Sequence, residues 1–174
     1  LVGSEMCIRD RHWIDSCMKT RGSAMAQLRI ALASDHGGFE QKEELRPWLE
    51  DLGFTVDDFG CDSEESVDYP DYAERAARAV AQGDDDYGIL VCGTGIGMMI
   101  AANKVAGIRA ANLTSPEFAK LSREHNDANV ATLSGRFTSL EDNKSIIETF
   151  LDTDFAGGRH ARRVEKIMTI EDAE

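Results

Sequence analysis

A glycine-rich turn is the clearest candidate for chemistry in this sequence. Residues 93–97 read Gly-Thr-Gly-Ile-Gly and separate two apolar stretches. Where a strand turns into a helix, successive backbone N–H groups converge and can bind an anion. The spacing matches neither the dinucleotide motif GxGxxG nor the phosphate loop GxxxxGK followed by Ser or Thr, so no nucleotide is indicated. A plain tight turn would also use glycines, and the residues alone leave that alternative open.

Cys92 immediately precedes this turn. A thiol at the amino end of a helix, among converging N–H dipoles, is biased toward the thiolate, which can act as a base or a nucleophile. Cysteine is also a common buried residue in parallel strands. The position therefore supports a catalytic and a structural cysteine equally well.

Two pairs of polar residues stand at other element ends. Asp35 and His36 follow the first apolar run and precede two glycines, a place suited to orienting a polar ligand. For Asp35 alone, capping of the next helix is the simpler interpretation. His125 and Asn126 stand near the end of a predicted helix, where a lone histidine often makes only a favourable contact with the helix dipole.

Cations near the C-terminus contrast with the acidity of the whole chain. Nineteen Lys and Arg against 32 Asp and Glu give a net charge of −13, which argues against nucleic acid or an anionic membrane as the main partner. The cations that stand out are Arg136, Arg159, His160, Arg162 and Arg163. Arginine binds phosphate through two parallel hydrogen bonds, so a small anionic substrate remains compatible with the charge. Balancing an acidic surface explains Arg162 equally well.

Short apolar runs alternate with amphipathic stretches along the chain. The runs predict strands at 28–34, 54–60, 87–93, 108–113 and 129–135. The stretches between and after them predict helices at 39–52, 69–82, 98–106, 116–125, 140–151 and 160–170. Pro47 predicts a kink in the first of these helices, and Thr114 with Glu117 forms a capping signal for the fourth.

Five strand–helix repeats predict an α/β fold, a doubly wound, Rossmann-like five-stranded parallel sheet with helices on both faces and an extra C-terminal helix. A chain of 174 residues suffices for one such domain. Ligands of such sheets bind beyond the carboxyl ends of the strands. We therefore expect the turns after Ser34, Cys92, Asn112 and Ser134 to carry the chemistry.

Residues 1–24 differ from the rest of the chain. They show no sustained period, and their opening resembles translated sequencing-adapter read-through, so we interpret them as a non-native or disordered leader before a single domain at 25–174. Within that domain, Cys61 and Cys92 have dissimilar surroundings and no export signal precedes them, which predicts a cytoplasmic protein. No apolar run approaches the roughly 18 residues that a membrane span needs.

Six motifs along the sequence resemble those of a known family. In order, it contains ASDHGGFEQKEEL, DYPDYA, GILVCGTGIGMMIAANKVAGIRAA, SREHNDANV, SGR and GGRHARRVEKI, which are similar to type B ribose-5-phosphate isomerase. The similarity covers essentially all of 25–174. It implies the fold described above, a homodimer with its site at the subunit interface, and interconversion of ribose 5-phosphate and ribulose 5-phosphate without a metal or other cofactor.

The resemblance also implies roles for individual residues. Cys92 would be the base that moves a proton between C1 and C2, and backbone groups of Gly93, Gly95, Ile96 and Gly97, together with Thr94, would bind the enediolate. His125, helped by Asp35, would open the furanose ring, and Asn126 would contact the substrate. The positions that match phosphate ligands are His36, Arg136, Arg159 and Arg163, some of them contributed across the dimer.

Some relatives place a Glu directly after the last glycine of the turn, but Met98 stands there in this chain and cannot accept a proton, which leaves Cys92 as the base.

Two alternatives accompany this resemblance. The substrate could be another phosphorylated aldose, such as allose 6-phosphate or galactose 6-phosphate. A non-catalytic sugar-phosphate-binding module would keep the glycines and arginines but would not need Cys92.

Overall fold

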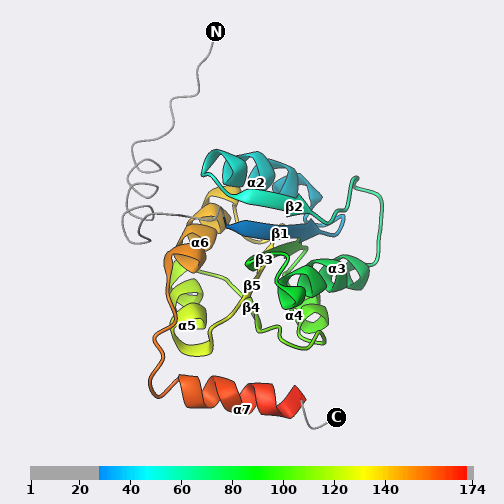
Figure 1. The fold of residues 1–174 in the computed structure, drawn as a ribbon. Helices are drawn as coiled ribbons and strands as arrows, with labels where there is room; N and C mark the ends of the chain where they lie inside the picture. The colour runs from blue at the N-terminus through cyan, green and yellow to red at the C-terminus, as the bar shows by residue number, and fades with distance from the viewer. Residues whose placement is uncertain (1–27, 172–174) are drawn as a thin grey trace.

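The computed structural model describes residues 28–171 (Figure 1). Its strands are β1 (Arg29–Ser34), β2 (Thr55–Asp58), β3 (Tyr87–Cys92), β4 (Ala110–Asn112) and β5 (Val130–Ser134). Its helices are α2 (Phe39–Asp51), α3 (Tyr69–Gln82), α4 (Ile96–Ala102), α5 (Pro116–Asn126), α6 (Leu140–Asp152) and α7 (Ala161–Glu171). Each predicted strand and helix is present, while the leader at 1–24 lies outside the described residues.

All five strands are parallel and lie in the order β2-β1-β3-β5-β4. The chain adds β2 on one side of β1, and β3, β4 and β5 all lie on the other side, with β4 at the edge and β5 between β3 and β4. The topology therefore switches between β1 and β3. Their ends are level, because Ser34 pairs with Val91, and Cys92 pairs with Ser134 on β5. The loops after β1, β3 and β5 therefore begin side by side at the switch point, where α/β sheets bind ligands.

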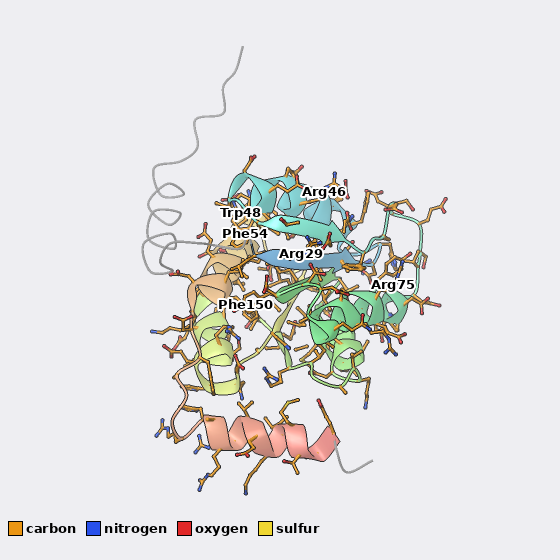
Figure 2. The ribbon with its side chains drawn as sticks, viewed as in Figure 1. Arg29, Arg46, Trp48, Phe54, Arg75 and Phe150 are labelled. Atoms are coloured by element: carbon orange, nitrogen blue, oxygen red, sulfur yellow. The ribbon has the colours of Figure 1, made fainter. Side chains whose placement is uncertain are left out.

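Helices cover both faces of the sheet, as predicted (Figure 1). Helices α2, α5 and α6 pack on one face, in a core that includes Leu45, Ile89 and Phe150. Phe54 belongs to the same core and Trp48 packs against it (Figure 2). Helices α3 and α4 cover the other face with small residues, four alanines of α3 among them. Strands buried from both sides explain why the runs read as continuously apolar.

Helix α7 stands apart from these layers (Figure 1). None of its residues from Ala161 to Glu171 is buried. It contacts the domain through Glu171, which accepts a hydrogen bond from the Gly107 N–H at 2.9 Å, and through Met168. A cavity of about 220 Å³ separates its Ile167 from the edge formed by β4.

Two local predictions differ from the structure. Helix α4 begins at Ile96 and ends at Ala102, earlier at both ends than the predicted 98–106. The cap of α5 is Ser115 and not Thr114, because Ser115 Oγ accepts the N–H of Phe118 at 3.3 Å. Pro116 sets the first helical residue, which leaves Thr114 one position too far out. Helix α2 continues through Pro47 as one element, and the kink expected there stays a prediction.

A buried carboxyl group lies at the amino edge of the sheet, away from the loops described above. The Asp85 side chain precedes β3, is 1% exposed, and its Oδ1 has no hydrogen-bond partner. Burial raises the pKa of Asp85 to about 7, and the hydrogen bond and negative charge of Asp57 act in the same direction, while the charge of Arg29 opposes them.

Candidate functional site

Three loops pack backbone to backbone at the switch point. A Cβ on Gly37 would lie 3.1 Å from the N atom of Gly93, and one on Gly135 would lie 2.7 Å from the carbonyl oxygen of Gly37. The Gly135 N–H also donates to the Cys92 carbonyl at 2.8 Å. Glycines at these positions therefore bring together the turns that follow β1, β3 and β5.

Cys92 ends β3 and is 4% exposed. Its Sγ accepts a hydrogen bond from the Gly95 N–H at 3.1 Å. Gly95 has φ of 80°, and a Cβ there would lie 2.1 Å from Asn112 Oδ1, so only glycine fits. The glycine thus directs a backbone dipole at the sulfur.

This geometry changes one expectation about the turn. The Gly95 N–H donates to Cys92, and the Ile96 N–H donates to Thr94 Oγ1 at 3.3 Å. Two of the N–H groups predicted to converge on an anion therefore already have partners within the turn. The turn is built around the sulfur at least as much as around an external anion.

Arg136 and Ser134 connect the turn to the loop after β5. The Arg136 side chain lies against Gly93, with Nη1 3.5 Å from the position of an added Cβ. Ser134 Oγ donates to the Gly93 carbonyl at 2.8 Å and accepts the Phe137 N–H at 2.9 Å. A guanidinium group therefore lies directly beside the glycine turn.

Asp35 and His36 complete this first cluster from the loop after β1. Asp35 Oδ1 accepts the N–H groups of Gly37 and Gly38 at 2.8 and 3.1 Å, so it orders the turn before α2. It does not cap the helix itself, because the N-cap is Gly38 and no side chain caps α2. His36 Nδ1 accepts the Val67 N–H at 3.2 Å. This bond leaves Nε2 as the nitrogen that carries the proton in the neutral ring.

His125 and Asn126 belong to a second cluster, at the end of α5. The His125 ring stacks on the His160 ring, with centroids 4.2 Å apart and planes within 4°. Arg159 Nε lies 3.3 Å from His160 Nε2, and the Arg163 N–H donates to the His160 carbonyl at 2.9 Å. Burial lowers the pKa of His160, as do the positive charges of His125, Arg159 and Arg163.

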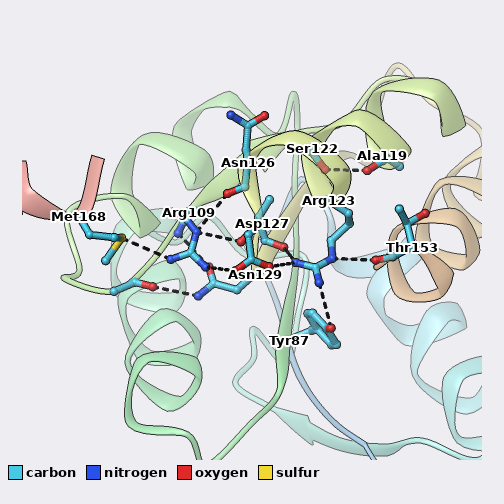
Figure 3. Close-up of polar contacts among 12 residues, drawn as sticks. Tyr87, Arg109, Ala119, Ser122, Arg123, Asn126, Asp127, Asn129, Thr153 and Met168 are labelled. Carbon is cyan, nitrogen blue, oxygen red and sulfur yellow. Dashed lines mark hydrogen bonds and ion pairs between the residues drawn. The ribbon is translucent and has the colours of Figure 1, made fainter. Parts of the chain in front are cut away.

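A network of arginines and one aspartate lies beside this second cluster (Figure 3). Asp127 Oδ1 accepts a hydrogen bond from Arg123 at 2.9 Å, and Oδ2 accepts one from Arg109 at 3.0 Å. The polar triplet 125–127 is visible in the sequence, but nothing there marks either arginine as its partner. No sequence pattern predicts that Tyr69 lies beside the glycine turn either. Its ring lies 2.8 Å from the position that a Cβ on Gly97 would occupy.

The two clusters lie at opposite ends of the sheet. Cys92 ends β3 level with Ser134, the last residue of β5, whereas His125 lies in the last turn of α5, just before β5 begins at Val130. Five strand residues at about 3.3 Å each separate these levels by roughly 15 Å. The predicted site residues therefore form two groups within one chain. Asp35, His36, residues 93–97 and Arg136 gather around Cys92, and Asn126, Arg159 and Arg163 gather around His125.

Two observations concern other kinds of site. Among residues 28–171, no three His, Cys, Asp or Glu side chains gather in an arrangement that could hold a metal ion. In the same part of the chain, no helix combines the length and apolar character that crossing a membrane requires.

Comparisons with known proteins agree with the fold and with the motifs. Over 143 residues, the chain is 49% identical to ribose-5-phosphate isomerase B of Escherichia coli, an alignment that covers 82% of this chain and 96% of that protein. The solved structure of Clostridium thermocellum ribose-5-phosphate isomerase B is 49% identical, with a TM-score of 0.83 over 84% of this chain and 99% of that one.

A further structure, ribose-5-phosphate isomerase B of Mycoplasma genitalium with bound ribulose-5-phosphate, is 42% identical. It has a TM-score of 0.82 and covers 87% of this chain and 100% of that one. The sequence profile of the family described as Ribose/Galactose Isomerase matches residues 30–167. By fold, motifs and sequence, this chain belongs to the Ribose/Galactose Isomerase family.

Proposed function

We propose that this chain interconverts ribose 5-phosphate and ribulose 5-phosphate, with Cys92 as the base. The observation that carries the proposal is the Cys92 sulfur, buried at the topological switch point, contacted by the Gly95 N–H and flanked by the loop of Arg136. The names of the E. coli, C. thermocellum and M. genitalium relatives support the choice of substrate.

The reaction transfers one proton between neighbouring carbons. In the thiolate form, Cys92 removes the proton from C2 of the open-chain aldose, and the electron pair moves to the carbonyl oxygen to give an enediolate. The proton returns to C1, while the hydroxyl proton on O2 passes to O1 to give the ketose. N–H groups of the turn other than those of Gly95 and Ile96 would stabilise the developing oxyanion. Thr94, which is exposed at this turn, adds a hydroxyl donor.

Ring opening precedes this step, because ribose 5-phosphate exists mainly as a furanose. We assign it to His125, which would take the proton of the anomeric hydroxyl and return one to the ring oxygen, assisted by Asp35. Asn126, next to His125 and exposed, would hold a sugar hydroxyl. Histidine suits this work because its usual pKa lies near neutrality.

Phosphate binding requires local cations, because a chain with a net charge of −13 repels a dianion at long range. His36 offers an Nε2–H donor, and Arg136 lies beside the glycine turn. We assign Arg159 and Arg163 to the same phosphate from the second cluster. Charge-assisted hydrogen bonds of this kind are about twice as strong as neutral ones.

The separation of the two clusters supports a homodimer with composite sites. One chain holds Cys92 and His125 at opposite ends of its sheet, so a site with both must combine two chains. Ile96 and Ile100, half exposed and one turn apart on α4, and Ile170, 70% exposed on α7, offer apolar surface for such contact. We expect two identical sites per symmetric dimer, and a cytoplasmic location that suits a small phosphorylated substrate.

A coupled assay with three sugars tests the proposal. We expect turnover of ribose 5-phosphate to exceed that of allose 6-phosphate and galactose 6-phosphate. Cys92→Ser should lower kcat at least about a hundredfold while substrate still binds, because a serine hydroxyl is far too weak an acid to supply the base. Cys61→Ser, the other buried cysteine of the described chain, is the matched control and should retain activity.

Near wild-type turnover in Cys92→Ser would remove that residue from the mechanism. A preference for a 6-phosphate sugar would keep the mechanism and replace the substrate.

A further inference from the structure

Asp127 has an unusual backbone conformation. It is the C-cap of α5 and, among the described residues, the only non-glycine with positive φ, at 47°. Asp and Asn adopt this left-handed conformation more readily than other side chains. The Asp127 N–H still donates to the Arg123 carbonyl at 3.1 Å, and the left-handed backbone at Asp127 then ends the helix directly after His125 and Asn126.

The Asp127 carboxylate bridges two arginines, with one oxygen for each (Figure 3). Arg123 is 5% exposed, and its guanidinium lies 5.0 Å from the Tyr87 ring centroid. Arg123 also donates to the carbonyls of Ala128 at 2.6 Å and Thr153 at 3.2 Å. With so many partners, Arg123 is a rigid anchor for the carboxylate.

Arg109 extends the network to the proposed sugar-binding residues (Figure 3). Its Nε donates to the carbonyls of Asn126 at 3.1 Å and Asp127 at 2.8 Å, and its Nη1 lies 3.4 Å from Met168 Sδ on α7. Asp127 holds the other branch of the same guanidinium through Nη2. The carboxylate therefore aligns the Arg109 fork that ties the end of α5 to α7.

We propose that Asp127 is a positioning residue for ring opening: through Arg109 and Arg123 it fixes the directions of His125 and Asn126. The inference rests on the proposed function and adds a residue to it. In the proposed mechanism His125 acts on the closed ring and Cys92 on the open chain, so losing the Asp127 charge should impair ring opening and leave proton transfer at Cys92 nearly unchanged.

The two reaction directions separate these steps. Ribose 5-phosphate enters mainly as a closed ring. Ribulose 5-phosphate is an open chain, since the phosphate on O5 blocks furanose formation, and its aldehyde product can close in solution. The ratio of the two rates, measured on one sample, is independent of the fraction of folded enzyme.

Two variants keep the left-handed backbone. Asp127→Asn is neutral and of similar shape, and Asp127→Gly has no side chain. Both should lower kcat from ribose 5-phosphate by about ten- to a hundredfold, as misplaced catalytic groups do, and lower kcat from ribulose 5-phosphate by less than about threefold. Lys120→Gln is the control, because it removes only the exposed Lys120–Glu124 pair on the same helix and should change neither rate.

A proportional loss in both directions, or no loss in either, would overturn the positioning role. If the wild-type enzyme converts neither sugar, the proposed function itself is wrong. Spectra of ¹⁵N-labelled histidine give a second readout that does not depend on activity. The signals of His125 and His160 should shift in Asp127→Asn while that of His36 stays in place, and unchanged spectra would contradict the inference.

Discussion

Mixing two inactive variants tests directly whether the site is shared between subunits. Cys92→Ser disables the cluster at the carboxyl ends of the strands, and His125→Asn disables the cluster roughly 15 Å away at the other end of the sheet. In a dimer of one chain of each kind, Cys92 of one chain faces His125 of the other at one site, and both defects fall together at the second site. Each heterodimer therefore has one intact site.

The expected recovery follows from this count. Random reassociation of equal amounts makes half of all dimers heterodimers, each with one intact site of two, so the mixture should regain about a quarter of wild-type activity. The assay is turnover of ribose 5-phosphate, with subunit exchange verified by native mass spectrometry. Mixing Cys92→Ser with Arg136→Ala is the control, because both changes fall in the same cluster and no intact site can form. No recovery in the first mixture after verified exchange would refute the composite site.

Three further predictions address other parts of the chain. Val67→Pro removes the N–H that donates to His36 Nδ1, so the KM for ribose 5-phosphate should rise roughly three- to tenfold with a smaller change in kcat, whereas Val67→Ala keeps the donor and should behave as wild type. Arg163→Ala should raise the KM for phosphorylated sugars about ten- to a hundredfold, and an equal effect of Arg162→Ala would show that only general charge matters. Asp85 has a pKa of about 7 in the folded protein, against 3.8 ordinarily. Between these two pH values the folded state binds more protons than the unfolded state. The free energy of unfolding therefore falls as pH rises from about 4 to 7. Asp85→Asn should flatten this slope and, at pH 8, stabilise the protein by on the order of 2 kcal/mol in urea melts; an unchanged slope would contradict the assignment.

The elements and the first cluster could be predicted from the apolar pattern of the sequence. Apolar runs such as 87–92 must be buried on both faces of a sheet. Because the segments that connect these runs are long enough to form helices, the strands must be parallel. Once the sheet is parallel, Cys92, the turn after it and the loop of Arg136 must meet at the same edge. Their proximity follows from strand direction alone, without knowledge of any side-chain contact.

The grouping of the remaining residues depends on tertiary contacts that the sequence pattern does not reveal. The resemblance placed His125 in one site with Cys92, but an α5 that runs antiparallel to the strands carries His125 to the opposite edge of its own sheet. Likewise, the N–H of Gly95 meets the Cys92 sulfur because its φ of 80° turns it there, and Asp127 meets Arg109 across 18 positions of the chain. Such contacts depend on how helices pack and how turns close, and neither has a period that can be seen in a sequence.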